Sequence, residues 1–300
     1  MEYTAIKNPD PLHIWLHASR PKTLPAAIAP VIIGTALAFA DGQFHPLAAI
    51  MAALGALFIQ IGTNFANDYF DYYKGADDKD RLGPVRVTQA GLVKPAAMKQ
   101  AFITAYLVAA LFGAYLVYRG GWPIMLIGAL SILFGIAYTG GPYPLGYYGW
   151  GDVFVFIFFG PVAVGGAYYV QALEINYYVL LAGIAPGLFS TAILTVNNLR
   201  DIHTDRKAGK KTLAVRWGEN FARLEYLFCL FTAPLTVIPL VLLTRAHYMA
   251  LLVFLIWFAA IYPLRVIFME KPGVIYNYVL AATGRLLLIY SILFTIGWLL

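Results

Sequence analysis

Two short segments gather asparagine and aspartate residues that could bind a metal ion. The first reads NFANDYFDYYKGADD and begins at Asn64, and the second reads NNLRDIHTD and begins at Asn197. Together with Asp80, just beyond the first segment, they account for seven of the 15 acidic residues of the chain. Carboxylate and amide oxygens suit Mg²⁺, which typically binds one or two carboxylates and then substrate phosphate oxygens. The ligands of a zinc site, cysteine and histidine, are absent from both segments except for His203.

Helical spacing predicts that the polar groups of each segment share one face. The residues are Asn64, Asp68 and Asp71 at i, i+4, i+7, and Asn197, Asp201 and Asp205 at i, i+4, i+8. Residues three and four apart are neighbours on a helix surface, so each segment forms an oxygen-rich stripe. A single cluster could equally be a solvated loop edge without function. Two matched clusters in a chain with so few acids favour a functional site near the membrane.

Basic residues follow both segments. They are Lys74, Arg81 and Arg86 after the first, and Arg206, Lys207, Lys210 and Lys211 after the second. Mg²⁺ together with Lys or Arg side chains commonly holds a diphosphate and stabilises it as a leaving group. Loops on the cytoplasmic side of membrane proteins are basic for reasons of topology, which is the alternative explanation for each of these residues. A GxxxxGK[ST] phosphate-binding loop is absent from the sequence.

Composition indicates what must position these segments. Of 300 residues, 61% are hydrophobic and 12% are charged, and the mean hydropathy is +0.71. Soluble domains carry roughly 25% charged residues, and disordered chains need low hydrophobicity, so both classes are excluded. Cys229 is the only cysteine, which excludes a disulfide scaffold. The remaining class is a polytopic membrane protein.

Nine apolar runs are long enough to be transmembrane helices, since a span takes about 20 residues. They cover 24–40, 47–66, 96–118, 122–138, 152–172, 177–199, 220–243, 247–268 and 275–299. We predict an all-α fold, a polytopic membrane helical bundle of about nine transmembrane helices around a central cavity, forming one domain over residues 1–300. Each Asn/Asp segment ends the second helix of a four-helix block. This suggests two pseudo-repeated blocks, about 24–138 and 152–268, plus a final helix over 275–299.

The distribution of charge predicts the orientation. With nine spans, all of the 21 basic residues except Arg119, Arg245 and Arg285 fall on one side, and Arg285 lies inside the last span. The positive-inside rule then places the N-terminus and the two Asn/Asp segments at the cytoplasmic face and the C-terminus outside. The spacing of apolar residues over 12–16 suits a short interfacial helix before the first span, and a flexible tail is the equal alternative.

Four stretches of the chain are similar to one protein family. They are RPKTLPAAIAPV (20–31), NFANDYFDYYKGADDKDRLGPVRVTQAGLV (64–93), YTGGPYPLGYYGWGD (138–152) and NNLRDIHTDRKAGKKTLAVRWG (197–218). The chain resembles the UbiA superfamily of intramembrane prenyltransferases, and more closely its 1,4-dihydroxy-2-naphthoate polyprenyltransferase branch. The first motif of the superfamily is often written NDxxDxxxD. Here its last position is Gly75, and the KGxD variant is typical of the naphthoate branch; Asp77 or Asp78 would replace the missing aspartate.

The resemblance implies an activity. Enzymes of this branch transfer a polyprenyl chain from polyprenyl diphosphate to 1,4-dihydroxy-2-naphthoate in a Mg²⁺-dependent reaction, with decarboxylation, and yield demethylmenaquinone for menaquinone biosynthesis. The enzyme would sit in the lipid bilayer of the cell membrane as a helical bundle with a lateral opening to lipid and an active site facing the cytoplasm.

The resemblance also implies roles for matched residues. The expected catalytic residues are Asp68, Asp71, Asp201 and Asp205. The expected metal site comprises these four with Asp77, Asn64 and Asn197. The expected diphosphate contacts are Asn67, Lys74, Arg81, Lys211 and Arg20. No residue is assigned to the aromatic acceptor.

Other functions remain open at this point. A related prenyltransferase could use 4-hydroxybenzoate, homogentisate or haem as acceptor, or a geranylgeranyl donor for ether lipids. A divalent-cation transporter could use the same acids, although transporters place their sites near the bilayer midplane. A phosphatidyltransferase is disfavoured because the DGxxAR run is absent.

Overall fold

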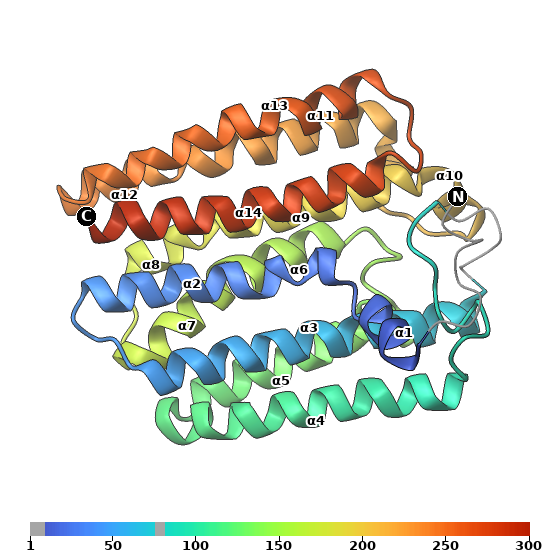
Figure 1. The fold of residues 1–300 in the computed structure, drawn as a ribbon, viewed down its shortest axis with the longest axis horizontal. Helices are drawn as coiled ribbons and strands as arrows, with labels where there is room; N and C mark the ends of the chain where they lie inside the picture. Colours follow the sequence, from blue (N-terminus) through green and yellow to red (C-terminus); the bar gives the residue numbers. More distant parts are fainter. Residues whose placement is uncertain (1–9, 76–81) are drawn as a thin grey trace.

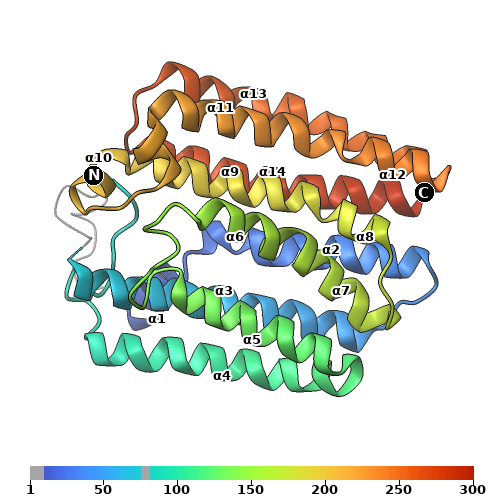
Figure 2. The same ribbon diagram turned by 180° about the vertical axis from the view of Figure 1, so that it is seen from behind.

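The chain forms a bundle of long helices that run side by side along the longest axis of the molecule (Figure 1). The structure is a computed structural model that describes residues 10–75 and 82–300, and no strand occurs in these ranges. A short helix, α1 (Pro11–Ala18), precedes a bend of 55° into α2. The helix α10 lies at the same end of the bundle as α1, and the C-terminus lies at the opposite end (Figures 1 and 2).

The helices of the first half are α2 (Pro25–Ala40), α3 (Pro46–Lys74), α4 (Pro95–Gly120) and α5 (Trp122–Ala137), with the short turn η1 (Pro21–Thr23) before α2. Those of the second half are α6 (Gly151–Ile157), η2 (Phe158–Val162), α7 (Ala163–Ala172), α8 (Tyr177–Ala182), α9 (Ile184–Arg200), α10 (Ile202–Lys207), α11 (Leu213–Leu235), α12 (Val237–Thr244), η3 (Tyr248–Leu255), α13 (Ile256–Met269) and α14 (Tyr276–Leu299). Several begin with proline at their first position, where the missing N–H has no helical partner.

Each of the nine predicted spans falls on one helix or on two or three consecutive helical segments. By length and composition, seven helical stretches of the described chain qualify as membrane spans, and the bent pair over residues 11–40 would be an eighth. Trp122–Ala137 is apolar but shorter, so the count of nine is approximate. The prediction of an all-helical multi-pass membrane bundle is confirmed.

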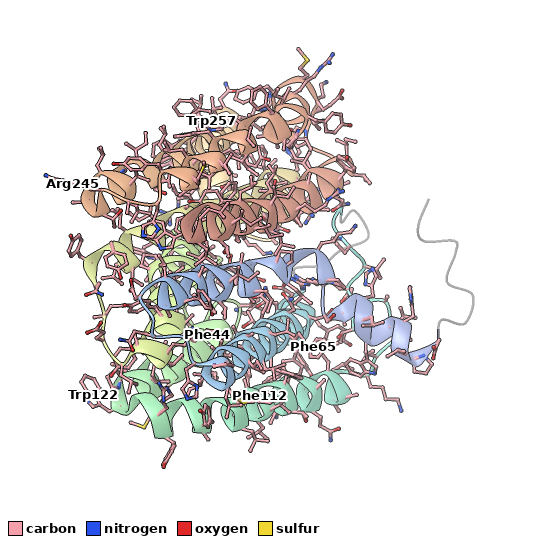
Figure 3. All side chains as sticks on the ribbon, turned by 60° about the vertical axis from the view of Figure 1, so that its left-hand side comes forward. Phe44, Phe65, Phe112, Trp122, Arg245 and Trp257 are labelled. Carbon is pink, nitrogen blue, oxygen red and sulfur yellow. The ribbon has the colours of Figure 1, made fainter. Side chains whose placement is uncertain are left out.

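Large apolar side chains cover the outside of the bundle. Leu111, Leu242 and Phe258 are each 70% exposed or more, which a protein in water would avoid but which lipid tails solvate well. Trp122 begins α5 and Arg245 follows α12, and both lie at one end of the bundle (Figure 3), which Figure 1 shows to be opposite α10. Exposed aromatic side chains at helix ends are typical of membrane interfaces.

Close helix packing inside the bundle depends on small residues. A Cβ on Gly34 of α2 would lie 2.6 Å from the carbonyl oxygen of Val164 in α7, and one on Gly187 of α9 would lie 2.6 Å from that of Phe156 in α6. Without side chains at these two positions the backbones approach closely. The span over residues 151–172 is kinked at Gly160, which precedes Pro161.

Candidate active site

The first Asn/Asp segment lies at the end of α3. The helix stops at Gly75, which adopts the left-handed conformation (φ 60°) and donates its N–H to the carbonyl oxygens of Asp71 and Tyr72. Glycine takes this C-terminal capping conformation without steric cost, whereas an aspartate would be strained. Gly75 thus explains why the last position of the NDxxDxxxD pattern carries no acid: the helical stripe has already ended there.

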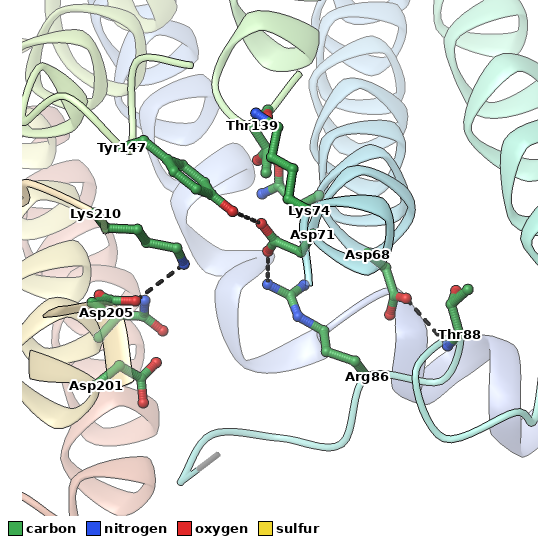
Figure 4. Close-up of polar contacts among 12 residues, drawn as sticks. Asp68, Asp71, Lys74, Arg86, Thr88, Thr139, Tyr147, Asp201, Asp205 and Lys210 are labelled. Carbon is green, nitrogen blue, oxygen red and sulfur yellow. Dashed lines mark hydrogen bonds and ion pairs between the residues drawn. The ribbon is translucent and has the colours of Figure 1, made fainter. Parts of the chain in front are cut away.

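Asp71 is buried and holds two partners in the site. Its Oδ2 accepts a hydrogen bond from Nη2 of Arg86 at 2.7 Å, and its Oδ1 accepts one from the Tyr147 hydroxyl at 2.8 Å (Figure 4). The ion pair with Arg86 has both side chains nearly inaccessible to solvent. A buried carboxylate requires such pairing, because removal from water without a partner costs several kcal/mol.

Asp68 faces a different neighbour. Its two carboxylate oxygens accept hydrogen bonds from the backbone N–H groups of Val87 and Thr88, each at 3.2 Å (Figure 4). In this arrangement Asp68 holds the segment that follows the first motif in place, and Arg86 lies directly before the two bonded residues. One aspartate of the motif therefore positions the cation that pairs with the other.

The second segment is not one continuous helix, which differs from the predicted stripe. The helix α9 ends at Arg200, Asp201 forms a turn (φ −96°, ψ 11°), and α10 starts at Ile202. Asp201 accepts two hydrogen bonds from the buried guanidinium of Arg200, at 2.8 and 2.6 Å. Arg200 also donates to the side-chain oxygens of Asn197 and Asn277, both at 2.8 Å.

Tyr147 links the two segments. Its hydroxyl binds Asp71, while Nζ of Lys74 and of Lys210 lie 4.7 and 4.9 Å from the centre of its ring. Lys210 also forms an ion pair with Asp205 at 3.1 Å. Figure 4 shows the series running from Asp205 through Lys210 and Tyr147 to Asp71. Cations over the faces of aromatic rings are stabilised electrostatically, so this tyrosine favours positive charge beside the carboxylates.

Both segments border one polar cavity of about 190 Å³. Among its lining residues are Arg20, Asn64, Asn67, Asp71, Arg86, Asn197, Asn198, Asp205 and Lys210. The predicted convergence of the two segments is thus present. Asp68 and Asp201 do not line this cavity. Asp68 instead binds the backbone next to Arg86, and Asp201 binds the guanidinium of Arg200.

The other residues expected at the site fall into three sets. Arg20 and Asn67 line the cavity as expected, and Asn67 accepts a hydrogen bond from the Thr139 hydroxyl. Lys74 and Lys211 are not among the lining residues, although Lys74 donates to the carbonyl oxygen of Thr139 at 2.6 Å. Asp77, Asp78 and Arg81 lie outside the described residues.

Several lining residues had no assigned role in the sequence-based prediction. Arg86 and Lys210 are the two cations paired with the cavity carboxylates, and Tyr147 and Asn198 border the same space. Both cations stand in basic stretches where the sequence alone does not rank one lysine or arginine above its neighbours. Their ion pairs with Asp71 and Asp205 distinguish them, and Arg86 is also buried.

The chemistry of the donor set fits a hard divalent cation shared with a substrate. Two carboxylates, Asp71 and Asp205, and four asparagine side chains face the cavity. Across residues 10–75 and 82–300 no group of three or more acidic, histidine or cysteine side chains is close enough to enclose a metal ion. Mg²⁺ sites with few carboxylates complete their shells with water and phosphate oxygens, so this set suits a metal that arrives with a phosphate-bearing ligand.

A larger apolar cavity of about 610 Å³ adjoins the polar one. The two share the lining residues Ala26, Gln60, Thr63, Tyr138, Val155 and Phe159. Most of its wall consists of alanine, glycine, valine, isoleucine and phenylalanine side chains from α2 to α7. A molecule with a charged head and a long hydrocarbon tail would satisfy both cavities at once.

The sequence of the chain is similar to those of known proteins. The chain matches the model of the UbiA prenyltransferase family over residues 27–274. It is 44% identical over 239 residues to a protein of Escherichia coli (strain K12) named 1,4-dihydroxy-2-naphthoate octaprenyltransferase, covering 78% of this chain and 77% of the relative. A protein of the same name from Haemophilus influenzae is 36% identical over 295 residues, covering 95% and 96%.

The fold is also that of a solved structure, a UbiA homologue from Archaeoglobus fulgidus bound to GPP and Mg²⁺. The TM-score is 0.68 at 15% identity, and the match covers 95% of this chain and 99% of that chain. With a family model that spans most of the chain and relatives of high identity, the chain belongs to the UbiA prenyltransferase family.

Proposed function

We propose that this prenyltransferase transfers a polyprenyl group from polyprenyl diphosphate to 1,4-dihydroxy-2-naphthoate, with loss of the ring carboxylate as CO₂, as a step of menaquinone biosynthesis. The observation that carries the proposal is the pair of adjoining cavities, one polar and bordered by both Asn/Asp segments, the other apolar. The names of the relatives supply the acceptor.

The polar cavity would hold the diphosphate. Arg20, Arg86 and Lys210 border it and supply positive charge, and Asp71 and Asp205 with the asparagine amides would hold Mg²⁺. When bound, Mg²⁺ neutralises the diphosphate and makes it a better leaving group. Asp68 and Asp201 stay predicted as ligands, direct or through water, alongside the contacts they make with Val87, Thr88 and Arg200.

The apolar cavity would hold the isoprenoid tail and exclude water from the reacting carbon. The allylic C–O bond breaks with its electron pair passing to the diphosphate, and the ring carbon that bears the carboxylate bonds to the resulting cation. The bond to the ring carboxylate then breaks, its electron pair restores the aromatic ring, and CO₂ leaves. A dry cavity protects the cation from hydrolysis, because water would compete with the ring as nucleophile.

The multi-pass chain is proposed to lie in the cell membrane with the α1 and α10 end in the cytoplasm. Most described basic residues gather at that end of the bundle, which the positive-inside rule favours. The C-terminus, at the opposite end (Figure 1), would then face outside. We further infer two pseudo-repeated four-helix blocks within one domain, since α3 and the α8–α9 pair each stand second in their block and each end in an Asn/Asp segment.

A prenyl-transfer assay on the full chain in lipid vesicles tests the proposal. Donors of graded length would be combined with 1,4-dihydroxy-2-naphthoate, 4-hydroxybenzoate or homogentisate, with Mg²⁺ or with a chelator. We expect a prenylated, decarboxylated product from the naphthoate, and we expect it only when Mg²⁺ is present. Prenylation of 4-hydroxybenzoate without activity on the naphthoate would contradict the choice of acceptor, and metal flux without a prenyl donor would support a transporter instead.

A further inference from the structure

A serine on α9 has an unusual environment for a membrane helix. Ser190 is 3% exposed, lines the polar cavity, and its hydroxyl has no hydrogen-bond partner. Its neighbours behave differently: Thr191 and Thr195 donate to the carbonyl oxygens of Gly187 and Thr191, at 3.0 and 2.9 Å. Such bonds to the preceding turn are the usual way in which hydroxyls are satisfied in apolar helices. A buried hydroxyl that makes no such bond and borders a cavity is available to bind a ligand.

A glutamine occupies the corresponding depth on α3. Gln60 is buried, lines both cavities, and donates to the Thr23 hydroxyl at 3.5 Å. Among the described residues its side-chain carbonyl oxygen accepts no hydrogen bond. Gln60 and Ser190 each precede by two helical turns an asparagine that lines the polar cavity, Asn67 and Asn197 respectively. At 1.5 Å per residue both lie about 10 Å deeper along their helices than those asparagines. Gln60 lies at the junction where the polar cavity meets the apolar one, and Ser190 borders the polar cavity at a similar depth.

The two helices stand on opposite sides of this junction. Both α3 and α9 pack against α2, and they lie in different halves of the bundle with α2 between them (Figures 1 and 2). A ligand in the junction therefore meets Gln60 on one side and Ser190 on the other, and Thr63 and Tyr138 also line the junction. This pattern suits a flat aromatic molecule that carries an oxygen at each of two opposite ring positions.

We propose that the aromatic acceptor binds in this junction, with one of its two para ring hydroxyls on Ser190 and the other on the side-chain carbonyl oxygen of Gln60. The inference rests on the proposed function and assigns the acceptor site within it. The arrangement places the ring beside the position where the diphosphate head passes into the hydrocarbon tail, which is where the new carbon–carbon bond forms.

The two side chains would also favour the reaction itself. As the ring gives electron density to the allylic cation, its hydroxyl groups become more acidic. Hydrogen bonds that these hydroxyls donate to Ser190 and Gln60 then strengthen on the way to the transition state. Interactions of this kind lower the barrier more than they stabilise the bound substrate.

The test uses the full chain in vesicles with saturating polyprenyl diphosphate and Mg²⁺ and with varied acceptor. Ser190→Ala and Gln60→Met each remove one hydrogen bond at nearly constant volume, and we expect each to raise the KM for the acceptor about three- to tenfold. The KM for the donor should stay unchanged. Ser190→Thr, which restores a hydroxyl, should recover most of the loss. Thr191→Val, which removes a hydroxyl bonded within its own helix, should keep the acceptor KM of the parent.

Two acceptor analogues, each lacking one of the two ring hydroxyls, identify the pairing. The parent enzyme should use each analogue less well than the acceptor that carries both ring hydroxyls. Ser190→Ala should be insensitive to the loss of one hydroxyl and Gln60→Met to the loss of the other. An unchanged acceptor KM in Ser190→Ala, a loss of donor binding in the same variant, or insensitivity of both variants to the same analogue would overturn the inference. If the parent enzyme does not prenylate the naphthoate at all, the proposed function itself fails.

Discussion

The carboxylates of the polar cavity are paired with cations of the same chain. Asp71 pairs with Arg86 at 2.7 Å and Asp205 with Lys210 at 3.1 Å. Burial of a carboxylate without such a partner is costly, because the group loses its contacts with water. The arrangement keeps two negative charges available within a bundle whose walls are otherwise apolar.

Substitution of Asp71 tests its expected role as a metal ligand. Asp71→Asn keeps the shape of the side chain but removes the charge, and we expect prenyl transfer to fall about a hundredfold or more, by analogy with the loss of one electrostatic group in other enzymes. The rate would be measured across Mg²⁺ concentrations. The matched control is Asp41→Asn, since Asp41 binds the hydroxyls of Tyr168 and Tyr178 away from the cavity. Equal losses in both variants would point to a folding defect.

Tyr147 should act through both its hydroxyl and its ring. Tyr147→Phe removes the hydrogen bond to Asp71. Tyr147→Leu also removes the aromatic ring over which the ammonium groups of Lys74 and Lys210 lie. Bonds to charged groups contribute about 1.5–3 kcal/mol and cation–π contacts about 0.5–2 kcal/mol. We expect the KM for the prenyl diphosphate to rise in the order Tyr, Phe, Leu. Tyr143, which is 75% exposed in the same loop, provides the control variant Tyr143→Leu; a reversed order at position 147 would refute the role of the ring.

At the scale of elements, the segment over residues 82–94 is bonded directly to two helices and through one of them to a third. Asp68 binds the N–H groups of Val87 and Thr88 from α3, and Asn277 of α14 donates to the carbonyl oxygen of Leu82 at 2.9 Å. Asn277 in turn accepts a hydrogen bond from Arg200 of α9, which holds Asp201. The two motifs are therefore connected through the backbone of this segment as well as through the cavity.

Loss of the Asp68 carboxylate should loosen this segment. In Asp68→Ala, we expect faster hydrogen exchange at the amides of Val87 and Thr88 and a loss of prenyl transfer, because Arg86 is no longer positioned beside Asp71. Hydrogen exchange measured by mass spectrometry and the Mg²⁺ dependence of the rate separate the two roles of Asp68. Unchanged exchange together with a weakened Mg²⁺ dependence would assign Asp68 to the metal rather than to the segment.

For the whole molecule, the volume of the apolar cavity should limit the isoprenoid tail. Gly113 and Gly128 line this cavity, and a Cβ at either position would meet open space. Gly128→Phe should therefore project a ring into the cavity without disturbing the helix packing. We expect transfer of long polyprenyl groups to fall at least about tenfold relative to short ones, since overfilling a packed space typically costs 1–3 kcal/mol.

The length dependence is measured with a series of prenyl diphosphates at fixed acceptor. Leu126→Phe is the matched control because Leu126 lies on the same helix, is 48% exposed and does not line the cavity. An equal loss for short and long donors in Gly128→Phe, or the same length dependence in the control, would mean that the tail lies elsewhere.

Much of the fold could be predicted because it follows from local properties of the chain. Runs of about 20 apolar residues must form helices in lipid, where every backbone polar group has to be bonded within its own segment. The Asn/Asp segments were identified by residue type and spacing, and the motif resemblance supplied the chemistry. Trp122–Ala137 shows the limit of this reasoning, since its length is marginal for a span and the exact number of crossings depends on it.

Only the tertiary structure decided which groups meet. Spacing placed Asp68 and Asp71 on one stripe of α3, yet Asp71 faces the cavity while Asp68 faces the backbone of Val87 and Thr88. Arg86 was one of several basic residues after the first motif, and Ser190 and Gln60 carry no local signal at all, because their proposed roles arise from burial beside residues distant in sequence. Helix formation is fixed by neighbours along the chain, whereas the side of a helix that borders a cavity depends on how the other helices pack around it.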